Sequence, residues 1–424
     1  MTMEPKFKIA LINHSFQINY FSRRWEIFAE QHPNVDVTLI APREHEWYAG
    51  KGYTYDGGKK YTSYEFDRGN YHRRLVDMAA GWESDGYKPL LDELKPDVIY
   101  IVGSVIGVVR QISKLRKKYY PSMKVINFDM RGLPKLRKPN TIQPYELLRQ
   151  IKHCFNAYRH VSCVNKNMDA IFCHYPEAVR LYRKEGYKGP IYMQTQVGVN
   201  AEWFHPDDEA RKEIREKYNI ADSTYVFGSA TRFTTDKGID DIVNALPKEG
   251  DWKYIMMGTG SEEDVNRLKN LVKSLGLEDK IIMPGMIDWY EIAKYWNAVD
   301  CCIHVPRTTE HWVETFSLTA IQPQATKKPV IGNTSGSVPY QIGFDEMIVP
   351  EGDIQALHDK IQWVLDHQAE AAEIGEKMYR RCMDSFSVQH LDDMFYDTIV
   401  EDVLQGKYDE AKIDMTKYTP KKHE

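Results

Sequence analysis

Short apolar runs alternate with stretches of helical period along most of this 424-residue chain, and this alternation most limits its fold. Because the runs are apolar on both faces, they predict parallel strands buried between layers of helices. In the first half the expected strands cover residues 8–13, 35–41, 97–103, 124–128, 161–164, 170–174 and 190–193. The expected helices between them cover residues 20–31, 105–118, 143–155 and 177–184.

A polar, proline-bearing segment over residues 200–208 interrupts this rhythm like a linker, and a second series follows it. Its expected strands cover residues 225–230, 252–257, 280–284, 301–305, 329–333 and 346–349. Its expected helices cover residues 239–246, 262–275, 289–298, 318–325 and 354–366. The chain is therefore predicted to be an α/β protein with two doubly wound, Rossmann-like domains facing across a cleft.

Composition limits the classes of partner and the compartment. Lys and Arg number 56 against 61 Asp and Glu, a net charge of −5 that gives no reason to expect nucleic acid. The six cysteines form no CxxC pair and no zinc-ligand spacing, so reduced thiols and no metal are expected. With no apparent secretory leader and no long apolar run, we expect a cytoplasmic protein whose membrane contact would be peripheral.

The densest chemical signal is a turn between a strand and a helix, Ser229 to Gly238. Such a turn presents backbone N–H groups and the positive end of a helix dipole to an anion. Arg232 and Lys237 add two cations suited to a diphosphate, although this pair taken alone is explained better as a solvated basic pair at a helix start.

Two later segments fit the same kind of site. Gly258-Thr259-Gly260 follows an apolar strand, as a tight turn would. The polar loop from His304 to Leu318 carries Glu314 and leads into a helix that Thr315 or Ser317 is expected to cap. Free N–H groups at that helix start would complete a phosphate cradle.

The order of these motifs resembles that of family-four glycosyltransferases, retaining enzymes of the GT-B architecture. The likeness runs from Gly198-Val199-Asn200 with Phe204 and Pro206, through the turns described above, to Phe386-Ser387. The resemblance implies domains at 1–199 and 200–387, with a last helix at 388–407 returning to the first domain. Residues 408–424 are expected to be a frayed tail.

The resemblance also implies roles for individual residues. Arg232 and Lys237 would hold the diphosphate of the donor, and Glu314 would contact the transferred sugar. Further donor contacts are implied for Gly258, Gly260, Thr315, Phe316, Ser317, Leu318 and Gln322.

Several positions depart from the family pattern. Thr315 and Ser317 replace two loop glycines, and Tyr340 replaces a glutamate. Gln322, followed by Pro323, replaces a glutamate that typically accepts hydrogen bonds from the nucleoside ribose. Because an amide keeps a carbonyl acceptor but lacks the charge, weaker ribose binding is expected.

The first half has weaker signals. His14 follows the first strand and either faces the cleft or is a hydrogen-bonded structural histidine. Asp129 and Arg131 follow a middle strand and are candidates for acceptor contact. The basic intervals 114–118 and 135–138 either contact anionic lipid or are solvated faces.

These observations lead us to expect a retaining, metal-independent glycosyltransferase without a cofactor. It would move a hexose-type sugar from a nucleotide diphosphate sugar to a sugar, lipid-linked or glycoconjugate acceptor in polysaccharide, glycolipid or glycoconjugate synthesis. The alternatives are a catalytically weak, nucleotide-sugar-binding partner subunit and a sugar-nucleotide epimerase of the same build.

Overall fold

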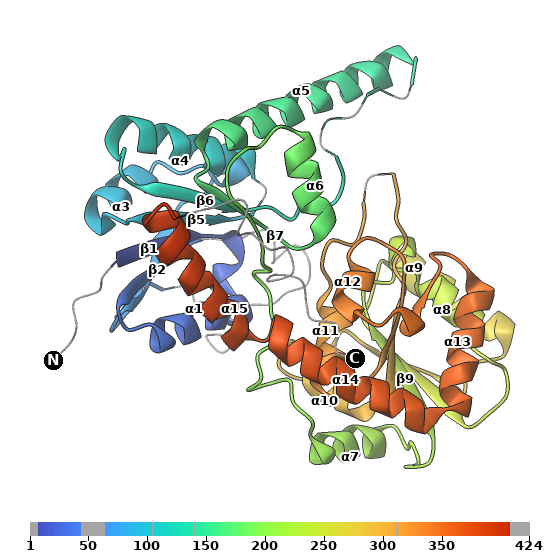
Figure 1. Ribbon diagram of the computed structural model, residues 1–424. Helices are drawn as coiled ribbons and strands as arrows, with labels where there is room; N and C mark the ends of the chain where they lie inside the picture. The colour runs from blue at the N-terminus through green and yellow to red at the C-terminus, as the bar shows by residue number, and fades with distance from the viewer. Residues whose placement is uncertain are drawn as a thin grey trace. The chain divides into compact units, whose positions relative to one another are not determined.

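The computed structural model describes residues 7–43 and 64–407, apart from positions 104, 135, 137, 140 and 311. The chain divides into two compact units, each a sheet flanked by helices (Figure 1). The first comprises Met1–Gln196 and the segment from Leu391, and the second comprises Val197–His390. The tail expected at 408–424 lies outside the described residues.

The first unit is built on an eight-stranded sheet of order β3-β4-β2-β1-β5-β6-β7-β8. All neighbouring strands are parallel except β3 and β4. The strands are β1 (Phe7–Ile12), β2 (Val35–Pro42), β3 (Phe66–Arg68), β4 (Tyr71–Val76), β5 (Val98–Val102), β6 (Lys124–Phe128), β7 (Ala170–Cys173) and β8 (Ile191–Met193).

Helices of this unit cover both faces of the sheet. They are α1 (Asn19–Gln31), α3 (Tyr87–Leu94), α4 (Ile106–Tyr119), α5 (Pro144–Asn167), α6 (Pro176–Lys184) and α15 (Val388–Asp397), which continues as a π-helical turn, Thr398–Leu404. The last helix packs here because Phe395 is buried beside Trp25 and Tyr100, and Asp392 pairs with Arg24 at 2.6 Å.

One expected strand, residues 161–164, is wrong. This segment lies inside α5, where Val161 and Val164 occupy one buried helical face. Periodicity alone does not distinguish a strand from a helix in a four-residue apolar run. Here the run continues the helical pattern that begins at Pro144.

The second unit has a six-stranded parallel sheet of order β11-β10-β9-β12-β13-β14. Its strands are β9 (Tyr225–Ala230), β10 (Trp252–Met257), β11 (Ile281–Gly285), β12 (Cys301–His304), β13 (Val330–Asn333) and β14 (Ile348–Val349). Its helices are α7 (Asp208–Lys217), α8 (Ile239–Ala245), α9 (Glu262–Leu275), α10 (Ile292–Ala298), α11 (Leu318–Ala325), α12 (Val338–Ile342), α13 (Ile354–Asp366) and α14 (Gln368–Phe386). The predicted pair of doubly wound α/β sheets is confirmed.

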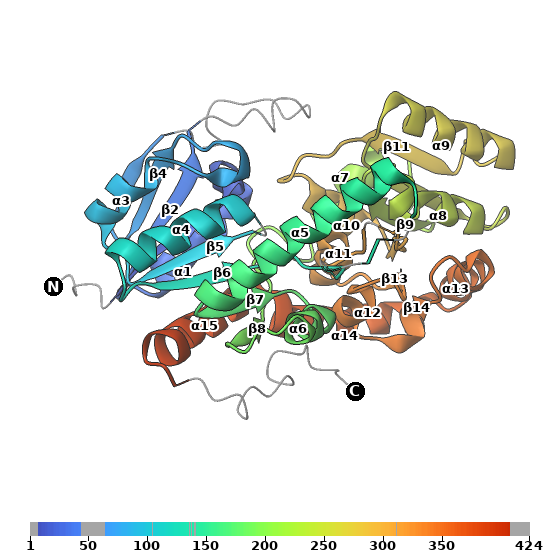
Figure 2. The same cartoon turned by 90° about the horizontal axis from the view of Figure 1, so that it is seen from above.

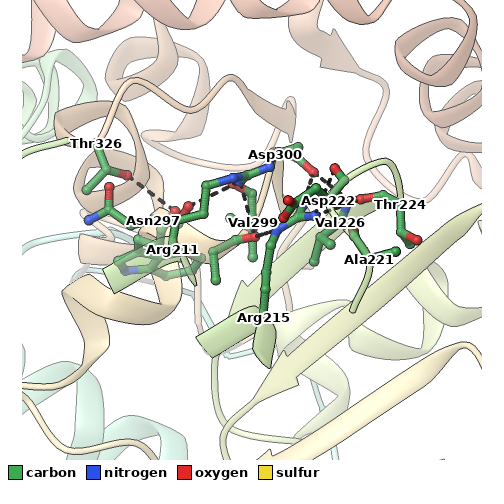
Figure 3. Close-up of polar contacts among 12 residues, drawn as sticks. Arg211, Arg215, Ala221, Asp222, Thr224, Val226, Asn297, Val299, Asp300 and Thr326 are labelled. Atoms are coloured by element: carbon green, nitrogen blue, oxygen red, sulfur yellow. Dashed lines mark hydrogen bonds and ion pairs between the residues drawn. The ribbon is translucent and has the colours of Figure 1, made fainter. Parts of the chain in front are cut away.

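Helix α7, which begins where the expected linker at 200–208 ends, is attached to this sheet through one carboxylate (Figure 3). Asp300 accepts hydrogen bonds from Arg211 and Arg215, each at 2.7 Å, and from the Val226 amide at 2.8 Å. Arg215 is buried and also donates to the Ala298 carbonyl at 3.2 Å. The network joins α7 to β9 and to the start of β12.

Candidate active site

The loops that carry the predicted site leave neighbouring strands of the second sheet. β9 lies between β10 and β12, and all three run parallel. Their carboxyl ends therefore lie at one edge, where the strand order reverses. This is the position at which doubly wound sheets bind their ligands.

Lys237 and Glu314 meet at this edge although 77 positions separate them in the chain. The Lys237 ammonium lies 3.0 Å from a carboxylate oxygen of Glu314 and 3.9 Å from the centre of the Trp312 ring. Glu314 is buried. Burial raises the pKa of its carboxyl group, while Lys237 and the Phe316 backbone amide oppose that rise. The cation and the carboxylate thus hold each other in place.

His304, at the end of β12, is a neighbour that the sequence reasoning missed as a site residue. Its ring is buried, and Nε2 lies 4.0 Å from Glu314. Burial, assisted by the charge of Lys237, lowers the pKa of His304 to about 3. The ring is therefore neutral near pH 7. Its position at the end of a strand, ahead of the glutamate loop, was the only signal available.

Arg232 lies in the same turn as Lys237, and its side chain is exposed. Within the described part of the chain it forms no ion pair. The turn ends at Gly238, whose φ is +67°. A Cβ atom there would lie 1.9 Å from the Val305 carbonyl oxygen, so glycine is needed to bring this turn against the end of β12.

The backbone around Gly258 leaves no space for a side chain. Its φ is +134°, and a Cβ atom would lie 1.8 Å from the Thr231 carbonyl oxygen. Gly260 precedes Ser261, which caps α9 in a capping box with Asp264. Gly258 is thus explained by close backbone packing, whereas a Cβ atom at Gly260 would lie 2.9 Å from Cβ of Asp264. Contact of either glycine with a donor remains a prediction.

The expected side-chain cap on α11 is wrong. Ser317 occupies the N-cap position, but its hydroxyl makes no capping hydrogen bond. Gln341, fully buried, accepts a hydrogen bond from the Ser317 amide and donates one to the Ser317 carbonyl, both at 2.8 Å. The Ser317 N–H is therefore already used. The amides of Leu318 and Thr319, at the first two helical positions, have no carbonyl acceptor within the helix.

Gln322 lies in α11 and contacts α10. It is buried, and its carbonyl oxygen accepts a hydrogen bond from the Trp296 indole N–H at 3.2 Å. Because a carbonyl oxygen has two lone pairs, this bond uses one of two acceptor sites, and the ribose contact stays a prediction. Pro323 removes one helical N–H, and the Thr319 carbonyl instead faces the Cys302 thiol at 3.7 Å.

Tyr340 belongs to α12, and Arg381 of α14 holds the end of that helix. The buried Arg381 donates to the carbonyls of Tyr340 and Ile342, and to that of Gln341 at 2.7 Å. Arg381 thereby fixes the backbone of Gln341, and the side-chain amide of Gln341 in turn binds the Ser317 backbone.

In the first unit, His14 lies just beyond β1, in the 3₁₀ turn His14–Gln17. Its Nε2 lies 3.2 Å from the Ser15 hydroxyl, and its ring lies 4.6 Å from that of Trp82. The ring is half-buried at the carboxyl end of the strand, and its contact with the acceptor substrate stays a prediction.

Asp129 and Arg131 require a correction. Both are buried, with their charged groups 3.4 Å apart. Arg131 also pairs with Glu185 and stacks on the Tyr182 ring at 3.9 Å, while the Tyr182 hydroxyl donates to Asp129. These side chains form a closed cluster that joins β6 to α6. This geometry argues against contact of Asp129 or Arg131 with an acceptor substrate.

Part of the chain is similar in sequence to known proteins. Residues 210–381 match the family model described as glycosyl transferases group 1. The chain is 25% identical over 198 residues to N-acetyl-alpha-D-glucosaminyl L-malate synthase of Bacillus anthracis, covering 46% of this chain and 49% of that protein. It is 25% identical over 194 residues to a GDP-mannose-dependent monoacylated alpha-(1-6)-phosphatidylinositol monomannoside mannosyltransferase of Corynebacterium glutamicum, covering 44% and 50%. The chain spans about half the length of these curated relatives.

Solved structures resemble nearly the whole chain. Sucrose-phosphate synthase from Thermosynechococcus elongatus aligns with a TM-score of 0.69 at 17% identity, over 92% of this chain and 98% of that one. Anabaena Alr3699/HepE in complex with UDP aligns with a TM-score of 0.66 at 13% identity, over 92% and 99%. Residues 210–381 thus match the family model of the glycosyl transferases group 1, and the chain has the GT-B fold.

Proposed function

We propose that this chain is a retaining glycosyltransferase that moves a hexose-type sugar from a nucleotide diphosphate sugar to an acceptor hydroxyl. One observation carries the proposal. Lys237 and Glu314, from loops far apart in the sequence, meet at the sheet edge next to the free N-terminus of α11. A cation, a carboxylate and unpaired amides are what a donor with a diphosphate and sugar hydroxyls requires.

In this proposal the bond between the anomeric carbon and the diphosphate oxygen breaks while the acceptor oxygen bonds to the same face. The acceptor proton passes to the departing phosphate. Arg232, Lys237 and the amides of Leu318 and Thr319 stabilise the negative charge that develops on the diphosphate. Glu314 accepts a hydrogen bond from a sugar hydroxyl, and the Lys237 ammonium favours the ionised form of that carboxylate.

The nearby His304 has a positioning role in this scheme. Because its ring is neutral, it adds no charge beside Glu314 and leaves the Lys237 ammonium as the compensating cation. A protonated imidazole at this place would compete for the carboxylate.

The first experiment is a thermal-shift screen against UDP, GDP, ADP and their sugars, since ligand stabilisation rises with affinity. Turnover is then measured with the stabilising donor. Arg232→Ala or Lys237→Ala should lower kcat by about 10²–10³-fold, by analogy with the loss of one oxyanion donor. Arg380→Ala, an exposed arginine on α14, is the matched control and should leave turnover unchanged. Arg232→Ala turning over within about threefold of the wild type would refute its assignment.

The engaged carbonyl of Gln322 supports a second candidate, a partner subunit that binds nucleotide sugar with little catalysis. The two cases differ in one measurement. A partner subunit is stabilised by the donor, but the purified chain neither hydrolyses nor transfers it.

A further inference from the structure

Helix α5 has two apolar faces, and only one of them is covered. Its buried residues, Ala157, Val161 and Val164 among them, all lie in the C-terminal half. From Pro144 to Asn156 no residue of the helix is buried. This first half extends beyond the strands of its own unit (Figure 1, Figure 2).

The uncovered face is a continuous stripe of large apolar side chains. Five of them recur every three or four positions and are between 48% and 76% exposed. They are Tyr145, Leu148, Ile151, Phe155 and Tyr158. At 3.6 residues per turn the stripe points roughly 150° away from the buried face. Exposed apolar residues scattered singly need no explanation, but a contiguous stripe of this length marks an interaction surface.

Positive charge borders this α5 stripe along one side. Arg149, Lys152 and Arg159 are exposed, and their helical positions fall next to those of Leu148 and Tyr145. Glu146 is the only acidic residue of the helix, and it pairs with Arg149 at 2.7 Å. In a chain with a net charge of −5, this local excess of cations selects for an anionic partner.

We propose that α5 docks on the surface of an anionic lipid bilayer, with the α5 stripe among the acyl chains and the bordering cations at the headgroups. Helices with one apolar face, aromatic side chains and Lys or Arg beside it bind in this way. Among the described residues no helix is long and apolar enough to cross a membrane, so α5 would lie along the surface. A second copy of the chain is a poorer occupant, because two such helices would bring like charges together.

This surface is not the one expected from the basic intervals in the sequence. In residues 114–118 the guanidinium of Arg116 is committed to Asp169 at 3.0 Å and to the Asn167 carbonyl at 2.7 Å. No apolar stripe accompanies the exposed Lys117 and Lys118. The proposal does not depend on glycosyl transfer, since it requires only the α5 side chains.

Co-sedimentation with vesicles of phosphatidylcholine, with or without phosphatidylglycerol, tests the apolar part. The full chain should bind vesicles that contain phosphatidylglycerol and should bind pure phosphatidylcholine weakly. Ile151→Gln/Phe155→Gln should lower the partition coefficient by at least about tenfold. The matched control, Tyr119→Gln/Ile354→Gln, removes two exposed apolar side chains outside the stripe and should bind like the wild type.

A second pair of variants tests the charge. Lys152→Gln/Arg159→Gln should weaken binding by about 30-fold, because each cation at an anionic surface is worth about 1 kcal/mol. Lys117→Gln/Lys118→Gln on α4 should have little effect. Far-UV circular dichroism and thermal unfolding confirm that each variant is folded. Equal binding of the wild type and the α5 variants would overturn the proposal, as would a dimer in sedimentation velocity that Ile151→Gln/Phe155→Gln dissociates.

Discussion

Replacing Gln341 with leucine tests how the loop that leads into α11 at Ser317 is held. The Gln341 amide group makes three hydrogen bonds, two with the Ser317 backbone at 2.8 Å and one from the Ser337 hydroxyl at 3.1 Å. Leucine has nearly the same volume, so no large cavity forms. Three lost hydrogen bonds at about 1 kcal/mol each predict that the local structure loses about 3 kcal/mol.

Amide hydrogen exchange at Ser317 measures this loss directly. A loss of about 3 kcal/mol should speed exchange of the Ser317 amide by about 100-fold, while amides in α9 exchange as before. Gln341→Glu retains one acceptor but introduces a buried charge, and should also release the loop. Unchanged exchange at Ser317 in a folded Gln341→Leu protein would refute the idea that this side chain holds the loop.

Two further predictions concern stability. Asp300→Asn should lower the free energy of unfolding of the second unit by about 3 kcal/mol in urea titrations, because it leaves the guanidinium groups of Arg211 and Arg215 without their shared anion. A loss below about 1 kcal/mol would show that water replaces the carboxylate. The pKa of His304 is about 3 in the folded state and about 6.5 in the unfolded state. As the pH decreases below about 6.5, the unfolded state therefore binds a proton that the folded state does not, and the free energy of unfolding decreases. His304→Asn should therefore reduce the loss of stability between pH 7 and pH 5 by about 2 kcal/mol, and an unchanged pH profile would contradict a neutral, buried ring.

Much of the second unit could be predicted from local signals. The helix expected at 262–275 begins after the capping serine Ser261 and ends at Gly276, whose φ is +69°. Both signals act within one turn of the chain, so sequence alone located the boundaries. Strands β9 and β10 were likewise located to the residue, since each is a continuous apolar run ending in a turn.

Strand β4 shows what sequence reasoning could not predict. Its two arginines obscured the apolar pattern, yet Arg73 is buried. It donates to the Phe16 carbonyl at 2.6 Å and to the Ser22 hydroxyl at 3.2 Å. A buried guanidinium requires partners from distant segments, which no local pattern reveals. The closed cluster around Asp129 escaped prediction for the same reason.

The departures from the family pattern at α11 have a common physical basis. Neither Thr315 nor Ser317 has the left-handed backbone that would favour glycine, and φ of Ser317 is −121°. The helix is held by side chains instead. Gln341 holds its start, the Thr319 hydroxyl donates to the Ala230 carbonyl at 2.6 Å, and Gln322 accepts from Trp296. These three contacts hold α11 without a glycine loop. The same contacts use one acceptor site of the Gln322 carbonyl, and its role toward the nucleoside end of a donor stays a prediction.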